Sequence, residues 1–171
     1  TLTENVMMVQ HVWCAGKQID VLGNGYDPSG EFFLGDKKLT VEDLFSPDPL
    51  RLLFESAYIC NNARLEKKES GWNISGDPTE GSLMTLAARA GTRGVYHRIF
   101  TNSFESIRKR MSVLASGDGS RRKTLYAKGA PLELLACCDR IHRENGVFPL
   151  TEEDRKEVLK QNDDYATRGL R

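Results

Sequence analysis

The sequence lacks long apolar segments. Its 171 residues are 39% hydrophobic and 28% charged, as in an ordinary soluble globular protein, and the longest apolar runs are only a few residues. A transmembrane helix needs about 20 consecutive apolar residues, so we expect no direct membrane contact by this chain. The opening TLTENVMMVQ has neither an initiator methionine nor the regions of a signal peptide, which suggests a fragment of a longer protein.

An excess of positive charge is also missing. Lysine and arginine total 24, aspartate and glutamate total 24, and the formal net charge is zero. Nucleic acid is therefore not expected as a partner, because its binding requires a basic surface. The four cysteines form no CxxC pair and the three histidines are scattered, so we predict reduced thiols and no metal site.

Motifs of self-contained catalysis are absent as well. No GxxxxGK[ST] phosphate loop occurs, and no GxSxG motif supports a hydrolase triad. The G-x-G at Gly23 has Pro28 where a third glycine would stand, and it opens no amphipathic helix, which favours a turn. We therefore expect no catalytic residues in this chain, which also counts against a stand-alone enzyme such as a small kinase.

Several short segments have the composition of β-strands. Residues 5–13 are apolar and predict a buried strand, and residues 18–22 and 31–34 predict an antiparallel hairpin with a broad connection. Residues 110–116 and 123–128 are β-prone and are joined by Gly-Asp-Gly-Ser, which predicts a second hairpin.

Two helices carry recognisable start signals. Residues 49–61 predict a helix with proline at its first position and Asp48 as its N-cap. A second helix begins at Pro78, where Asp77 can cap the first turn and Glu80 stands three residues further on, as in a capping box.

The remaining pattern completes a single domain over residues 1–171. Residues 67–71 are polar and predict a loop, residues 131–138 predict a short helix, and Thr151 caps a last helix that ends near Ala166. The sum is an α+β fold: a mixed, mostly antiparallel sheet flanked by helices.

Three clusters could carry chemistry. GDPTEG at 76–81 places acids and a hydroxyl at a helix N-terminus, FESIRKRMSV at 104–113 joins an aromatic ring to three consecutive cations, and KGAP at 128–131 ends a strand with lysine. Each also has a purely structural interpretation: a capped helix, a solvated basic loop and a strand-to-helix turn. Sequence chemistry alone leaves both interpretations open.

Taken together and in this order, the three clusters resemble the nucleotide-binding domain of P-type ATPases. TLTE at 1–4 resembles the residues that follow the DKTG phosphorylation motif of that family, and YATRGLR at 165–171 resembles the hinge that returns to the phosphorylation domain. The resemblance covers the whole chain and is strongest to the calcium-pump-like branch, including its bacterial members. It implies that residues 1–171 are a domain inserted between those two points, with Thr1 and Arg171 close together.

The resemblance implies a role for each matching residue. Phe104 would stack on adenine, which a flat apolar ring suits, and Glu80 would accept a hydrogen bond from the adenine amino group. Lys109 and Lys128 would line the pocket and attract the phosphates. Gly129 would let the ring approach the backbone.

Three further residues complete the implied site. Arg171 would reach the phosphates from the hinge, and Thr79 and Asp77 would lie at the pocket edge. The chain also departs from the family pattern in two places. Ser106 replaces an arginine, so that a phosphate contact is missing or comes from Arg108 or Arg110. The usual glutamate after KGAP appears one place late, as Glu133.

The resemblance implies the ATP-binding domain of a cation-transporting ATPase, a cytoplasmic domain of an integral membrane protein. It would hold ATP and present the γ-phosphate to an aspartate of the neighbouring phosphorylation domain. That aspartate would precede Thr1. Phosphorylation and actuator domains of the same parent would be its partners, and magnesium would bind in the full-length parent. The isolated chain would bind ATP without turnover.

A non-catalytic interaction module that no longer binds nucleotide is the alternative. Calcium is the first expectation for the ion, and sodium/potassium, proton and manganese transport stay open.

Overall fold

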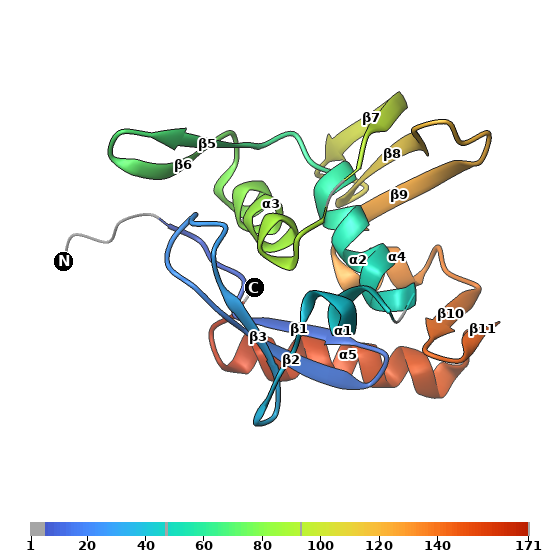
Figure 1. Cartoon of the computed structure of the whole chain (residues 1–171). Coiled ribbons are helices and arrows are strands. Elements are labelled where there is room, and N and C mark those ends of the chain that lie inside the picture. Colours follow the sequence, from blue (N-terminus) through green and yellow to red (C-terminus); the bar gives the residue numbers. More distant parts are fainter. Residues whose placement is uncertain (1–5, 47, 93, 171) are drawn as a thin grey trace.

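Short strands and helices alternate along the chain (Figure 1), and the computed structural model describes residues 6–46, 48–92 and 94–170. The helices are α1 (Val41–Phe45), α2 (Asp48–Ile59), α3 (Pro78–Ala90), α4 (Pro131–Leu135) and α5 (Glu152–Thr167). The strands are β1 (His11–Cys14), β2 (Lys17–Leu22), β3 (Glu31–Leu34), β4 (Lys37–Lys38), β5 (Arg64–Lys68), β6 (Gly71–Ser75), β7 (Tyr96–Glu105), β8 (Arg110–Gly117), β9 (Lys123–Gly129), β10 (Arg140–Arg143) and β11 (Gly146–Pro149).

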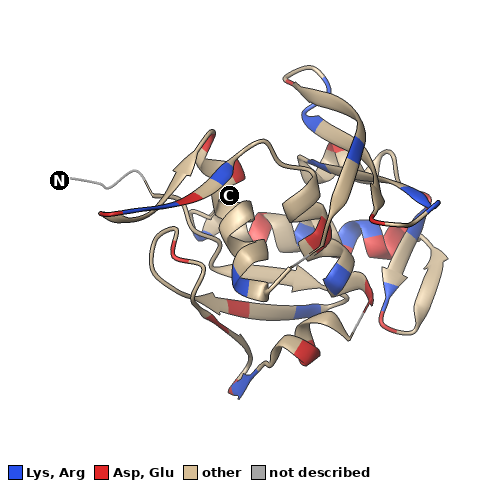
Figure 2. Cartoon of the chain, turned by 45° about the horizontal axis from the view of Figure 1, so that its top comes forward, with Lys and Arg blue, Asp and Glu red and all other residues tan. Residues whose placement is uncertain are grey.

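The strands form four antiparallel sheets in the described part of the chain, ordered β1-β2-β3-β4, β5-β6, β7-β8-β9 and β10-β11. The predicted α+β class is confirmed, and so are the hairpins that join β2 to β3 and β8 to β9. None of the helices among the described residues is long and apolar enough to cross a membrane. Basic and acidic residues both occur along many of the elements (Figure 2).

Two sequence-based predictions of secondary structure are wrong. The apolar residues before His11 do not form a strand: β1 covers only His11–Cys14, and the described residues before it are irregular. The polar segment at 67–71, expected to be a loop, lies within a hairpin formed by β5 and β6. Cross-strand packing outweighs composition there, because the Lys67 ammonium lies 5.9 Å from the Trp72 ring centroid, opposite it in the register.

Helix α2 connects two hydrophobic clusters. Phe54 packs in a cluster with residues of β1–β3, α1 and α3, whereas Ile59 packs in a second cluster against β8. Strand β8 buries alternate residues, Met111, Val113 and Ala115, as expected for a strand with one face on the core. This arrangement sets α2 against the β7-β8-β9 sheet, while α5 lies along the β1–β2 side (Figure 1).

The helix starts show which capping predictions hold. Thr151 caps α5 as predicted, whereas α2 already includes Asp48, which the sequence had suggested as its cap. Asp77 caps α3 by accepting hydrogen bonds from the backbone N–H groups of Thr79 at 2.8 Å and Glu80 at 3.1 Å. The predicted capping box is wrong, because the Glu80 carboxylate turns away from the cap toward other elements.

Candidate functional site

The Glu80 carboxylate is held from two sides. One oxygen, Oε1, lies 2.9 Å from the Nζ of Lys128 on β9. The other, Oε2, accepts a hydrogen bond of 3.0 Å from the backbone N–H of Asn62, in the loop between α2 and β5. The Glu80 and Lys128 side chains are only 17% and 20% exposed, so the ion pair is largely removed from water. Elements far apart in the sequence therefore fix the direction of this carboxylate.

The Lys128 ammonium is buried and has unused hydrogen-bonding capacity. Lys128 is opposite Met111 in the register of β8 and β9, and Met111 is completely buried, so the lysine side chain lies on the core-facing side of the sheet. Within the described residues, its buried Nζ forms an ion pair with Glu80 but has no hydrogen-bond partner. A buried ammonium with free N–H groups favours an anionic ligand.

Lys109 makes a different ion pair, at the neighbouring edge of the sheet. It lies in the turn between β7 and β8, and its Nζ is 2.8 Å from Glu133 Oε1 on α4. This hydrogen bond raises the pKa of Lys109 and lowers the pKa of Glu133. The glutamate that appears one place late after KGAP therefore still contacts a lysine of the predicted site.

Phe104 is an exposed aromatic residue on the sheet that carries Lys128. The residue is 58% exposed, on a stretch of β7 where the pairing with β8 is irregular between Asn102 and Glu105. Met111 on β8 lies opposite this irregular stretch, and Lys128 is the partner of Met111 on β9. Phe104 and Lys128 are thus two strands apart, a backbone separation of about 10 Å.

Arg108 stabilises the irregular stretch. Its guanidinium donates to Glu105 Oε2, to Asn102 Oδ1 and to the Ser103 carbonyl, each at 2.8 Å. The sequence offered Arg108 or Arg110 as substitutes for the arginine that Ser106 replaces. In this structure the Arg108 donors are committed to the strand that carries Phe104.

Gly129 is required by close packing. A Cβ atom at this position would overlap the Lys109 carbonyl oxygen and come within 2.7 Å of Arg110 Cα. The backbone N–H of Ala130 donates to the same Lys109 carbonyl at 3.0 Å. Glycine at 129 therefore holds the end of β9 against the turn that carries Lys109.

Of the remaining predicted residues, Thr79 lies near described segments from both ends of the chain. Thr79 lines a cavity of about 390 Å³ together with described segments from both ends of the chain, residues 6–11 and 169–170. Asp77 is the N-cap next to Thr79, and the hydrogen bond from the Glu80 backbone N–H lowers the pKa of its carboxyl group. Arg171 and Thr1 lie outside the described residues, so their predicted proximity stays a prediction.

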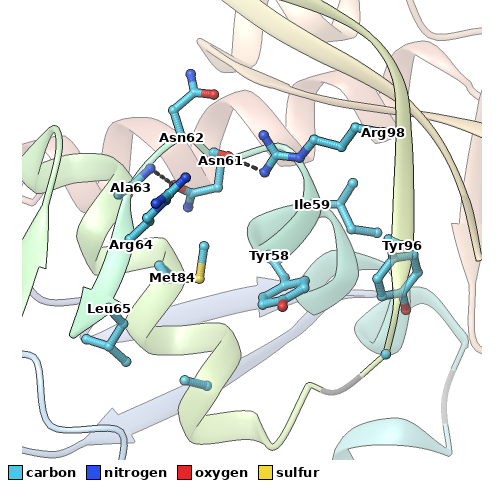
Figure 3. A pocket seen from close by; sticks show the side chains of 12 residues that line it. Tyr58, Ile59, Asn61, Asn62, Ala63, Arg64, Leu65, Met84, Tyr96 and Arg98 are labelled. Atoms are coloured by element: carbon cyan, nitrogen blue, oxygen red, sulfur yellow. Dashed lines mark hydrogen bonds between the residues drawn. The ribbon is translucent and has the colours of Figure 1, made fainter. Parts of the chain in front are cut away.

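A larger cavity of about 670 Å³ opens between α2, α3, β5 and β7 (Figure 3). Of the predicted residues that the structure describes, none lines it. The cavity is lined instead by residues that include Asn61, Asn62 and Arg98. The Asn61 amide donates to the Glu80 main-chain carbonyl, and the Asn62 N–H donates to the Glu80 carboxylate. Sequence analysis missed these asparagines, because an Asn pair after a helix has the composition of an ordinary turn.

The thiols and histidines offer no further site. All four cysteines are free, and burial raises the pKa of Cys60, whose thiol donates to the Met111 carbonyl. Over residues 6–46, 48–92 and 94–170, no group of three or more His, Cys, Asp or Glu side chains could hold a metal ion.

Comparison with known proteins agrees with the resemblance found in the motifs. The family described as P-type ATPase, cytoplasmic domain N, matches residues 49–171. The chain is 33% identical to a calcium-transporting ATPase of Bacillus subtilis (strain 168) and 36% identical to the cation-transporting ATPase pma1 of Synechocystis sp., with the whole chain and 19% of each relative aligned. It is 30% identical to calcium-transporting ATPase type 2C member 1 of Bos taurus, over the whole chain and 18% of that protein. The chain thus spans less than a fifth of the length of these curated relatives.

Proposed function

The chain belongs to the P-type ATPases, as their cytoplasmic domain N, and we propose that it is the ATP-binding domain of a cation-transporting pump. In this proposal residues 1–171 form one domain inserted into the phosphorylation domain of a longer membrane protein. The cavity lined by segments from both ends of the chain supports this, since an inserted domain leaves and returns through one hinge.

The observation that carries the proposal is the buried pair of Glu80 and Lys128, with the exposed Phe104 two strands away in the same sheet as Lys128. An ionised carboxylate can accept about four hydrogen bonds. The Asn62 N–H occupies one acceptor position on Glu80 Oε2, and the Lys128 ammonium lies 2.9 Å from Oε1 without a hydrogen bond, so acceptor positions remain for an adenine amino group. The free N–H groups of Lys128 suit an anion, and the ring of Phe104 offers a stacking surface for a base.

The chemistry that follows binding belongs to the parent protein. Domain N would hold ATP so that its γ-phosphate meets an aspartate of the phosphorylation domain, and the actuator domain would act later in the cycle. The role of these residues is therefore positioning and electrostatic attraction, which account for most of the catalysis of phosphoryl transfer. Magnesium would be held by carboxylates of the neighbouring domain, so ATP binding by this chain should depend little on it.

The transported ion is part of the same proposal. Two of the relatives named above are called calcium-transporting and one cation-transporting, which makes calcium the first ion to test. Ion selectivity would reside in membrane helices outside this chain. Transport assays of the full-length parent in vesicles, with calcium, manganese, sodium, potassium and proton gradients, would identify the ion.

A nucleotide titration of the isolated chain tests the proposal directly. One stacking ring, one acceptor and a few cations, set against the cost of association, should give roughly −4 to −6 kcal/mol, a high-micromolar to millimolar Kd. Calorimetry or NMR with ATP, with and without magnesium, should show this binding and no hydrolysis. Failure to bind ATP at about 10 mM would favour the alternative of an interaction module without nucleotide.

A further inference from the structure

Asn61 is a completely buried polar residue that joins α2, α3 and the loop between α2 and β5. Its amide nitrogen donates to the Ala57 carbonyl at 3.0 Å and to the Glu80 carbonyl at 2.8 Å. Its amide oxygen accepts from the Ala63 N–H at 2.9 Å. The Asn61 main-chain carbonyl also accepts from Arg98 on β7, a contact visible in Figure 3. Both amide hydrogens and the amide oxygen thus have partners.

These contacts control Glu80 at both ends. The bond from the Asn61 amide holds the main chain of Glu80 in the first turn of α3. The bond from Ala63 shapes the loop whose Asn62 N–H holds the Glu80 carboxylate at 3.0 Å. Without the Asn61 amide, the loop would no longer be hydrogen-bonded to the main chain of Glu80, and the Asn62 N–H would no longer be held in place. Lys128 alone would then orient the Glu80 carboxylate.

We propose that Asn61 is a positioning residue that aims the Glu80 carboxylate at the base of the nucleotide and so sets the preference for ATP over GTP. The inference rests on the proposed ATP-binding function. A carboxylate accepts a hydrogen bond from the amino group of adenine, whereas guanine presents a carbonyl oxygen at the corresponding position, which a carboxylate repels. The orientation of Glu80 therefore decides base discrimination and has little influence on the phosphates.

The test compares Asn61→Asp and Asn61→Ala in the 171-residue chain. Asn61→Asp keeps the acceptor for the Ala63 N–H but removes both donors and places a negative charge near the Glu80 carbonyl. Titrations with ATP and GTP, followed by NMR or calorimetry, should show ATP affinity falling about fivefold to tenfold while GTP affinity changes less than about twofold. In a Glu80→Ala background, Asn61→Asp should not change the ATP-to-GTP ratio further.

A core variant separates positioning from general destabilisation. Leu44→Ala removes a buried side chain from the cluster around β1–β3, away from Glu80, and should lower the melting temperature while leaving the ATP-to-GTP ratio unchanged. If both Asn61 variants fail to fold, Arg98→Leu is the substitute, because Arg98 is exposed and donates to the main-chain carbonyl of Asn61. Removing this donor should reduce the ATP-to-GTP affinity ratio by about twofold.

An unchanged ratio of ATP to GTP affinity in a folded Asn61 variant would overturn the positioning role alone, and so would equal losses of ATP and GTP affinity. If neither Asn61 variant folds, an unchanged ratio in Arg98→Leu would overturn it in the same way. A wild-type chain that binds neither nucleotide would overturn the proposed function, and the positioning role with it.

Discussion

The Lys128 ammonium should contribute more to ATP binding than any other single charge of the described chain. Lys128→Met is the sharpest perturbation, because methionine keeps most of the side-chain volume and removes only the charge. Glu80 would then keep its hydrogen bond from the Asn62 N–H and lose its cationic neighbour. Lys128→Glu would add repulsion, both toward the phosphates and toward Glu80.

The size of the effect follows from the burial of the ammonium. Two unit charges about 4 Å apart interact by about 4 kcal/mol at an effective dielectric constant of about 20. Part of this attraction is already used by Glu80, and the side chain is 20% exposed, so the net loss should be smaller. We expect roughly 1.5 to 3 kcal/mol, or about tenfold to a hundredfold weaker ATP binding at low salt.

Calorimetric titration at low and high salt measures this prediction. Lys109→Met is the matched control: it removes a lysine that is 58% exposed and paired with Glu133, so its effect should be smaller and should largely disappear at high salt. The Lys128→Met effect should persist, because a buried charge is screened much less. Circular dichroism must show that both variants fold. Equal ATP affinity of wild type and folded Lys128→Met at low salt would refute the reasoning.

Three further predictions follow from the same geometry. Phe104→Ala should weaken ATP binding by a factor of about ten, whereas Phe100→Ala, which removes a similarly exposed ring on the same strand, should not. Undiminished ATP binding by Phe104→Ala in a titration would remove the stacking role. Gly129→Ala should lower the free energy of unfolding by more than about 2 kcal/mol in urea titrations, since its Cβ overlaps the Lys109 carbonyl, and a wild-type midpoint would contradict this. The lowered pKa of Asp77 means that its ionised form stabilises the fold, so this contribution is present above its unfolded pKa of about 4 and is lost as pH falls through the lower folded value. Thermal unfolding of Asp77→Ala should thus show a loss of about 1 kcal/mol at neutral pH that shrinks toward pH 2, and a pH-independent difference would argue against it.

The amino-acid sequence by itself determined the local features of this domain. Asp77 and Thr151 start helices because a side-chain oxygen reaches N–H groups two or three residues away, which nearby residues alone decide. The hairpin of β8 and β9 follows from two β-prone runs around a glycine-rich turn. The motifs GDPTEG, FESIRKRMSV and KGAP likewise indicated the family that the comparisons confirm.

Only the tertiary structure decided which side chains those motifs bring together. Glu80 had the spacing of a capping box, but its carboxylate pairs with Lys128 because burial between α3 and the β7-β8-β9 sheet offers it a cation and the Asn62 N–H. Asn61 looked like a turn residue, yet complete burial requires its amide to be hydrogen-bonded, and the partners come from α2, α3 and the loop between α2 and β5. Local chemistry acts over a few residues and can be predicted from them, whereas the partner of a buried charge or amide depends on which elements pack against it.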